Sequence, residues 1–195
     1  MADKTKMTFT EIGSGDPVVV LGGKEAVSPL VNELSRHNRV LTIDQTGAGR
    51  IVDRALAGSI AQALTEFGVD RYSVIGLSEG ALIAIELAIF SPKPVKRLIL
   101  ISPPAIAQSD AELYERLANI EAPALVMIGT RDRSGAADSA RILRSKMRSC
   151  HLSLIYDAGR DLISDRPQAC IAPIGEFLES GEEFIVCRES QMIRP

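Results

Sequence analysis

The fold of this chain is decided by the stretch Tyr72–Ala88, which reads YSVIGLSEGALIAIELA. A short apolar run leads into Gly76-Leu77-Ser78-Glu79-Gly80, a Gly-x-Ser-x-Gly pattern, and a helix-forming segment follows it. This order predicts a sharp strand-to-helix turn that lifts the Ser78 hydroxyl clear of a sheet. Glycine suits both ends of such a turn, because a side chain there would collide with the neighbouring strand or helix. The alternative is a glycine-rich turn in another protein with a parallel sheet.

Apolar runs typical of strands alternate with helical patterns on both sides of this stretch. Strands are predicted at Pro17–Leu21, Arg39–Ile43, Ser73–Ile75, Arg97–Ile101, Ala124–Ile128 and Leu152–Tyr156. Helices are predicted around Val27–Leu34 and over Ala55–Phe67, Asp110–Asn119 with Asp110 as N-cap, Ala137–Met147 and Pro167–Glu179. The alternation predicts an α/β fold with a mostly parallel central sheet and helices on both faces. Thr8–Ile12 is a candidate antiparallel edge strand.

The length of the chain, 195 residues, suits a single domain over residues 1–195. The last part, residues 182–195, differs from the rest, because Glu183–Cys187 is β-prone and follows a glycine. This segment is open to four interpretations: an extra strand, a flap, a tail that pairs with a partner, or a tail packed on its own domain.

Composition excludes several classes of function. The net charge of −3 comes without a basic block, so nucleic acid is not an expected partner. The three cysteines are widely spaced and belong to no Cys/His cluster, so we expect no metal, no cofactor and no disulfide framework. A polar N-terminus and the lack of a long apolar run favour a cytoplasmic protein without a membrane segment.

Several segments, taken in order, resemble the α/β-hydrolase family, from about Val18 to about Leu178. The turn at Ser78 is similar to the family's nucleophile elbow. The other matching segments are Val18–Gly23, similar to the strand and turn of the oxyanion loop, Asp44–Arg50, similar to the Asp-x-x-Gly-x-Gly-x segment, Leu125–Arg133, similar to the acid strand and loop, and Tyr156–Leu162, similar to the loop after the last strand.

The resemblance implies a role for each matching residue. Ser78 would be the nucleophile and Asp132 the triad carboxylate. The backbone N–H groups of Gly23 and Glu79 would form the oxyanion hole, although the Glu79 carboxylate would oppose an oxyanion unless it is paired or turned away. The family's catalytic histidine follows the glycine of the last loop, and here Arg160 stands there. Arginine cannot act as the base, because its guanidinium stays protonated and has no acceptor lone pair.

The two histidines of the chain do not replace the missing base. His37 and His151 each precede a predicted strand, whereas the active site of this fold lies at the carboxyl ends of the strands. A strand of about five residues would keep them on the order of 15 Å from the site. A homo-oligomer, and with it a histidine from another subunit, stays open.

Two hypotheses follow for function. The first is a serine hydrolase of the esterase or acyl-transfer type, weak or inactive without its histidine, with a reduced or absent lid because the segment between Ile101 and Ala124 is short. The second is a catalytically silent domain that binds a small anionic ligand through Arg160, or a partner protein. In its simplest form Arg160 only forms an ion pair with Asp132, Asp157 or Asp161. The sequence does not identify the small-molecule substrate or ligand.

Overall fold

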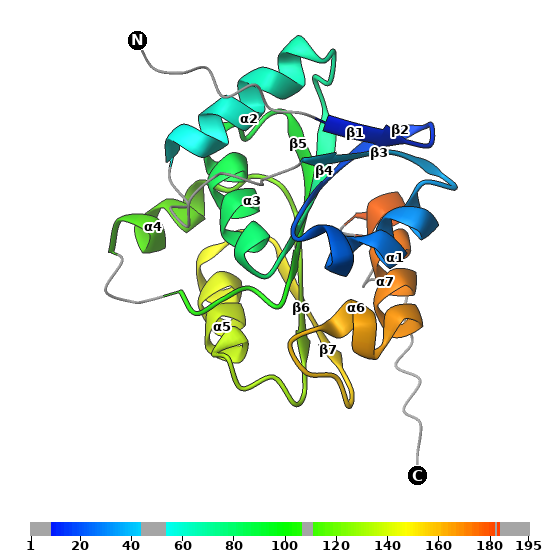
Figure 1. Cartoon of the computed structure of the whole chain (residues 1–195). Coiled ribbons are helices and arrows are strands. Elements are labelled where there is room, and N and C mark those ends of the chain that lie inside the picture. Colours follow the sequence, from blue (N-terminus) through cyan, green and yellow to red (C-terminus); the bar gives the residue numbers. More distant parts are fainter. Residues whose placement is uncertain (1–8, 44–53, 107–110, 182, 184–195) are drawn as a thin grey trace.

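One seven-stranded sheet, ordered β1-β3-β2-β4-β5-β6-β7, runs through the computed structural model, which describes residues 9–43, 54–106, 111–181 and 183 (Figure 1). Only β1 is antiparallel to its neighbour, β3, and the other pairs are parallel. The strands are β1 (Phe9–Ile12), β2 (Asp16–Leu21), β3 (Asn38–Ile43), β4 (Tyr72–Leu77), β5 (Val95–Ile101), β6 (Ala124–Gly129) and β7 (Cys150–Ile155). The chain moves from β2 to β3 in one direction and from β4 to β7 in the other, and in open parallel sheets the ligand-binding crevice is expected at the carboxyl ends of two such strands, here β2 and β4.

The helices cover both faces of the sheet (Figure 1). One face carries α2 (Arg54–Glu66), α3 (Glu79–Phe90), α4 (Ala111–Arg116) and α5 (Ala136–Lys146), and a 3₁₀ turn over Leu117–Asn119 follows α4. The other face carries α1 (Lys24–Leu34), α6 (Leu162–Asp165) and α7 (Pro167–Ser180). Each face has its own buried cluster of aliphatic side chains, as strands covered on both sides require.

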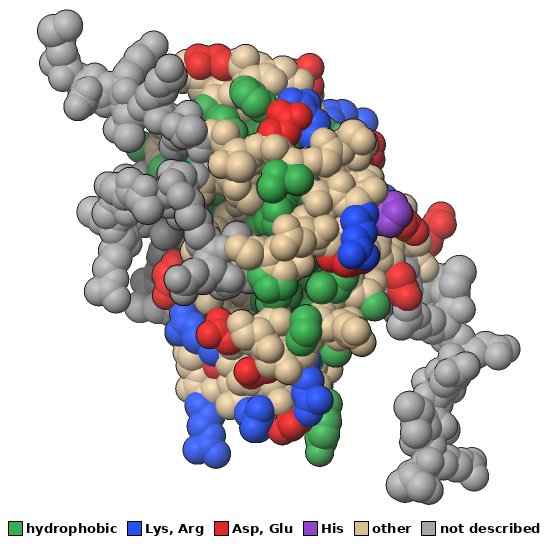
Figure 2. Space-filling view, turned by 45° about the vertical axis from the view of Figure 1, so that its right-hand side comes forward, with side chains coloured by type: hydrophobic (Ala, Val, Ile, Leu, Met, Phe, Trp, Pro, Cys, Tyr) green, Lys and Arg blue, Asp and Glu red, His purple; other side chains and the backbone are tan. Residues whose placement is uncertain are grey.

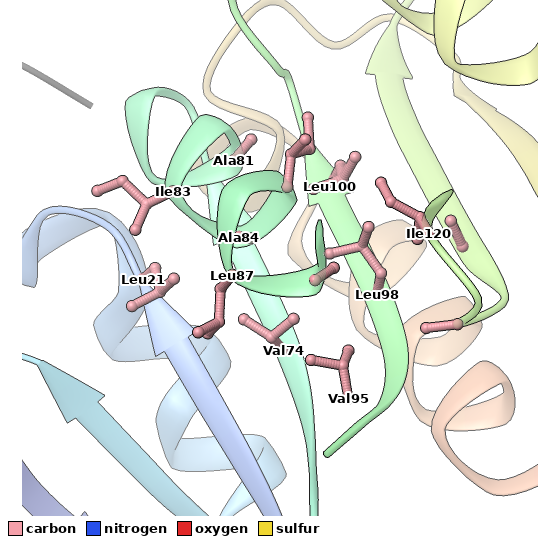
Figure 3. Packing of buried hydrophobic residues seen from close by; sticks show 14 of the residues in the cluster. Leu21, Val74, Ala81, Ile83, Ala84, Leu87, Val95, Leu98, Leu100 and Ile120 are labelled. Atoms are coloured by element: carbon pink, nitrogen blue, oxygen red, sulfur yellow. The ribbon is translucent and has the colours of Figure 1, made fainter. Parts of the chain in front are cut away.

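Helix α3 is the most buried helix of the described chain. Eight of its twelve residues are buried, which explains why its sequence is apolar on every side rather than along one stripe. Figure 3 shows Ala81, Ala84 and Leu87 of α3 packed against the side chains of the sheet. The neighbouring strands supply Leu21, Val74, Leu98 and Leu100 to the same cluster. This packing fixes the start of α3, and therefore Ser78, relative to the sheet.

The surface agrees with the mild net charge. On the face drawn in Figure 2, acidic and basic side chains are interspersed, and hydrophobic side chains form separate patches among them. Two surface ion pairs in the described residues join strands of the sheet: Arg39 of β3 with Glu11 of β1, and Lys96 of β5 with Asp16 of β2, where the Lys96 Nζ is 2.5 Å from the carboxylate.

The structure confirms the fold class, the parallel core and the antiparallel edge strand, and it corrects three details. The strand expected at Leu152–Tyr156 begins at Cys150, because Ala124 of β6 pairs with that residue. His151 therefore lies inside β7 instead of before it, still at the amino end. The short helix α6 was not predicted. Thr8, Asp110, Asp44–Arg50 and residues 184–195 lie outside the described residues.

Candidate active site

Ser78 occupies the strained corner that the Gly-x-Ser-x-Gly pattern predicts. It joins β4 to α3 with φ 50° and ψ −121°, a conformation that non-glycine residues rarely adopt. Its N–H donates a hydrogen bond to the carbonyl oxygen of Ile101 at 2.9 Å, which ties the corner to the end of β5. A Cβ at Gly76 would lie 2.5 Å from Ala81 Cα, so only glycine allows the chain to reverse so sharply.

The loop after β2 lies against the same corner. A Cβ at Gly80 would lie 2.2 Å from the carbonyl oxygen of Leu21, so this loop and the first turn of α3 are in close contact. Gly23 follows in the loop as the N-cap of α1, and Glu79 is the first residue of α3. The first N–H groups of a helix have no partner within the helix. Gly23 and Glu79 therefore stand at the starts of two helices, just after the carboxyl ends of β2 and β4 and close to Ser78 in the fold.

Arg160 and Ser78 line the same small hollow. The hollow is lined by Leu77, Ser78, Ile101 and Arg160 together with residues 161–164. The Arg160 guanidinium forms an ion pair with the Glu79 carboxylate at 2.9 Å, and both side chains are largely exposed. Glu79 was expected to oppose an oxyanion unless it was paired, and this ion pair supplies its partner.

The observed ion pair of Arg160 differs from those that the sequence suggested, which were with Asp132, Asp157 or Asp161. Glu79 takes this place because it directly follows Ser78, and Ser78 and Arg160 line the same hollow. The backbone of Arg160 is held by Ser102, whose hydroxyl donates a hydrogen bond to the Arg160 carbonyl oxygen at 2.8 Å. Ser102 itself is 1% exposed.

Asp132 follows the carboxyl end of β6, at the position predicted for the acid. Its N–H donates to the carbonyl oxygen of Gly129 at 3.1 Å, and its Oδ1 accepts the Ser134 N–H at 2.7 Å. Its Oδ2 is buried and has no hydrogen-bond partner among the described residues. One carboxylate oxygen of Asp132 thus accepts a hydrogen bond within its own loop, while the other is available to accept one.

The acid loop and the Arg160 loop are bound to each other by contacts that the sequence did not reveal. A Cβ at Gly129 would lie 2.2 Å from the Ala158 carbonyl oxygen and 2.3 Å from that of Gly159. The Arg131 N–H donates to the Ala158 carbonyl oxygen at 2.9 Å. The carboxylate of Asp157 lies between the guanidinium groups of Arg131 and Arg166. A glycine at the end of a strand indicates that another segment lies very close to it, but it does not identify that segment.

Strained backbone gathers at this edge of the sheet. Ser78, Ser102 and Asp157 have φ values of 50°, 44° and 56°, and they are the non-glycine residues with positive φ in the described ranges. They follow the carboxyl ends of β4, β5 and β7 respectively. Strain of this kind costs about 1–3 kcal/mol a residue and is typical of functional sites.

Comparison with known proteins agrees with this geometry. Solved structures share the fold: the enol-lactonase from Burkholderia xenovorans LB400 superposes with a TM-score of 0.78 at 18% identity, covering 89% of this chain and 96% of that one. A hydrolase from Pseudomonas aeruginosa gives a TM-score of 0.77 at 19% identity, covering 88% and 94%. The chain has the α/β-hydrolase fold.

Among curated proteins, this α/β-hydrolase-fold chain is similar in sequence to part of several proteins that carry the same name. It is 37% identical over 101 residues to "Putative carbamate hydrolase RutD" of Enterobacter cloacae, which is 45% of this chain and 38% of that protein. The protein of the same name from Yersinia enterocolitica is 32% identical over 82 residues, 38% and 30% of the two chains. The matches therefore span well under half the length of these relatives. No protein-family model matches the chain.

Within the α/β-hydrolase fold, the two histidines lie away from Ser78. His37 is exposed just before β3, and His151 is the second residue of β7, where its ring packs edge-on against Phe177 at 6.3 Å. Both positions are at the amino ends of parallel strands, whereas Ser78 follows a carboxyl end. No group of three or more His, Cys, Asp or Glu side chains in the described ranges could hold a metal ion.

Two buried thiols are poor candidates for a nucleophile. Cys150 and Cys170 are free, and burial raises the pKa of each to about 11, so neither is poised as a thiolate. None of the helices in the described part of the chain combines the length and the apolar character that crossing a bilayer requires.

Proposed function

We propose that this α/β-hydrolase-fold chain is a slow serine hydrolase, with Ser78 as nucleophile toward an ester or related acyl carbon. The observation that carries the proposal is the strained strand-to-helix corner at Ser78, which stands directly before the first turn of α3 and lines a small hollow. The names of the curated relatives add support for hydrolysis, although those relatives are matched over less than half their length.

In the proposed reaction the Ser78 oxygen bonds to the acyl carbon, and the charge that develops on the carbonyl oxygen is bound by the N–H groups of Gly23 and Glu79. The serine proton must leave to a base, which returns it to the leaving alcohol as the ester C–O bond breaks. A water molecule then attacks the acyl carbon, gives its proton to the same base, and releases the acid as the bond to the Ser78 oxygen breaks and the serine takes the proton back. Arg160 cannot take the serine proton. A water held by the carboxylate of Asp132 or Glu79 is the available acceptor, and it is a poor one. The oxyanion hole and binding alone give a rate roughly 10³–10⁴ times that in water.

The first test is labelling with a fluorophosphonate probe and hydrolysis of a small activated ester. We expect slow labelling of the wild type that Ser78→Ala abolishes, and turnover below about 1 per second. Equal labelling of both proteins would refute Ser78 as the nucleophile. Turnover typical of ordinary esterases would refute the absence of a base.

The second test is restoration of the missing base. The unused Oδ2 of Asp132 could accept the N–H of an imidazole at position 160, so Arg160→His should raise Ser78-dependent hydrolysis by about 10²–10⁴-fold. Glu79→Met in the same background should raise it further, because the carboxylate beside the oxyanion is lost. Arg133→His, on the exposed part of the acid loop, is the matched control and should gain nothing. A folded Arg160→His protein without activity would refute a dormant triad.

The ion pair of Arg160 favours a second candidate, a silent site that binds a small anion. Arg160 would exchange the Glu79 carboxylate for a carboxylate of the ligand, beside the N–H groups of the corner. Glu79→Gln should then strengthen binding of small carboxylates measured by calorimetry, and Arg160→Gln should abolish it. Equal binding by the two variants would exclude this site. The same site could contact an acidic group of a partner protein.

A further inference from the structure

Strand β7 is the edge of the sheet on the side away from β1, and half of its backbone groups face outward. The carbonyl oxygens of Ser149 and Ile155 accept hydrogen bonds from residues at the two ends of β6. Backbone groups of alternate residues point to opposite edges, so those of Leu152 and Leu154 face away from β6. The outward carbonyl of Cys150 is already bound by the Arg144 guanidinium, which leaves the rest of this edge open within the described structure.

The side chains along this edge are apolar and exposed. Leu152, Leu154 and Tyr156 are 39%, 64% and 83% exposed. Leu152 and Leu154 alternate with Cys150 along the strand and so lie on the face that carries α5, and Tyr156 directly follows the end of the strand in the same alternation. A regular edge strand with exposed apolar side chains is a template for pairing with another strand. The opposite edge, β1, is more polar: it presents Thr10 and Glu11 beside one exposed apolar residue, Ile12, and Glu11 is held in an ion pair with Arg39.

The place where α7 ends does not favour a partner strand for β7 from the residues that follow it. Helix α7 ends beside β5, where Arg97 donates to the carbonyl oxygen of Glu179 at 3.1 Å, and this is the amino edge of the sheet. A strand starting there would run parallel to β7. The crossover through α7 would pass over the opposite face from the crossover through α5, while moving in the same direction along the sheet. The two crossovers would therefore have opposite handedness. Because nearly all crossovers between parallel strands are right-handed, a strand after α7 that pairs with β7 is disfavoured.

We propose that β7 pairs with β7 of a second copy of this chain, antiparallel about a two-fold axis. An antiparallel strand is complementary to itself, so the outward N–H and C=O groups of both copies are satisfied at once. With the axis at Leu154, that residue faces the partner's Leu154, and Leu152 faces the partner's Tyr156. The apolar side chains of both copies then lie in one row, and the sheet continues from one copy into the other.

The size of this edge sets the strength of the dimer. Tyr156 buries about 150–200 Å² at most, and the three apolar side chains together fall short of the roughly 800 Å² per partner of a standard interface. The neighbouring surface of α5 must add to the contact. We therefore expect a concentration-dependent dimer with a dissociation constant in roughly the micromolar range.

The test measures the mass of the full chain by sedimentation equilibrium from low to high micromolar concentration. The average mass should rise from 21.0 kDa toward twice that value. Leu154→Lys should raise the dissociation constant at least about tenfold, the effect of about 1.4 kcal/mol. Thr10→Lys, on the exposed opposite edge, is the matched control and should leave the constant unchanged. A monomer at every concentration, or equal weakening by both variants, overturns the proposal.

Cross-linking tests the register. In the paired strands the two Leu154 Cα atoms would be about 5.5 Å apart, within the range that a disulfide spans. Leu154→Cys should form covalent dimers under mild oxidation, whereas Thr10→Cys, with the same native cysteines, should not. Equal cross-linking of the two variants overturns the β7 pairing, and would point to the chain's last residues as the contact.

Discussion

Substituting alanine for Gly129 tests whether the acid loop and the Arg160 loop lie together as described. The new Cβ would lie 2.2 Å and 2.3 Å from the carbonyl oxygens of Ala158 and Gly159. Non-bonded heavy atoms normally stay about 3.5 Å apart, so the loop must move by about 1 Å. That movement would break the hydrogen bond from Arg131 to Ala158, and the bond from the Gly159 N–H to Asp165 at 2.7 Å.

The magnitude follows from these losses. Overpacking costs about 1–3 kcal/mol, and each lost hydrogen bond costs about 1 kcal/mol. The lower entropy of unfolded alanine returns about 0.4–1 kcal/mol. The net loss for Gly129→Ala is about 3 kcal/mol. For a domain of this size, each kcal/mol shifts Tm by about 2–4 °C, so Tm should fall by roughly 6–12 °C.

The assay is a calorimetric melt with a matched control in the same protein. A Cβ added at Gly175, inside α7, would meet nothing within 4 Å, so Gly175→Ala should raise Tm slightly through helix propensity. If Gly129→Ala melts within about 2 °C of the wild type, the two loops do not lie against each other, and the placement of Arg160 at the site is wrong.

Three further outcomes are expected. Glu86→Ala should cost about 2–4 kcal/mol in urea unfolding, because it strands the nearly buried guanidinium of Arg116, 2.7 Å away; adding Arg116→Met should recover much of the loss. Ser102→Ala should speed tryptic cleavage after Arg160 by about fivefold, the value of one hydrogen bond, and an unchanged rate would show that Ser102 does not hold the loop. A hydrogen bond from its lysine partner holds the pKa of the Asp16 carboxyl below its ordinary value, so this ion pair stabilises the fold above that ordinary pKa and is lost as pH falls through the lowered one. Asp16→Asn should therefore cost under about 0.5 kcal/mol at pH 7, and the difference between the two proteins should vanish in strong acid.

The fold could be predicted because its signals are local. Each strand is a short apolar run, and each long helix repeats its apolar side chains at helical spacing. The corner at Ser78 was predictable for the same reason, since both glycines and the serine lie within five residues. The four-residue helix α6 was missed because so short an element carries no periodic pattern.

The contacts of the site were less predictable, because they join distant segments. Arg160 and Glu79 are separated by 81 residues, and nothing local to Arg160 distinguishes Glu79 from the nearer aspartates. The neighbours of Gly129 lie in a loop almost thirty residues later. Only the order of the strands, which brings the ends of β6 and β7 together, decides these contacts. The hydrophobicity of a strand also does not distinguish a central strand from an edge strand such as β7.

The positive φ values of Ser102 and Asp157 have a consequence for evolution in the laboratory. Glycine would adopt the same backbone at either position without strain, and the relief of about 1–3 kcal/mol exceeds the roughly 1 kcal/mol of the Ser102 hydrogen bond or of the exposed Asp157 ion pairs that it would remove. A population selected for heat resistance alone should therefore accumulate glycine at 102 and 157, whereas one selected for work at the Ser78 crevice should keep the serine and the aspartate. Sequencing both populations would show whether selection for activity at the Ser78 crevice, and not stability, keeps the serine at 102 and the aspartate at 157.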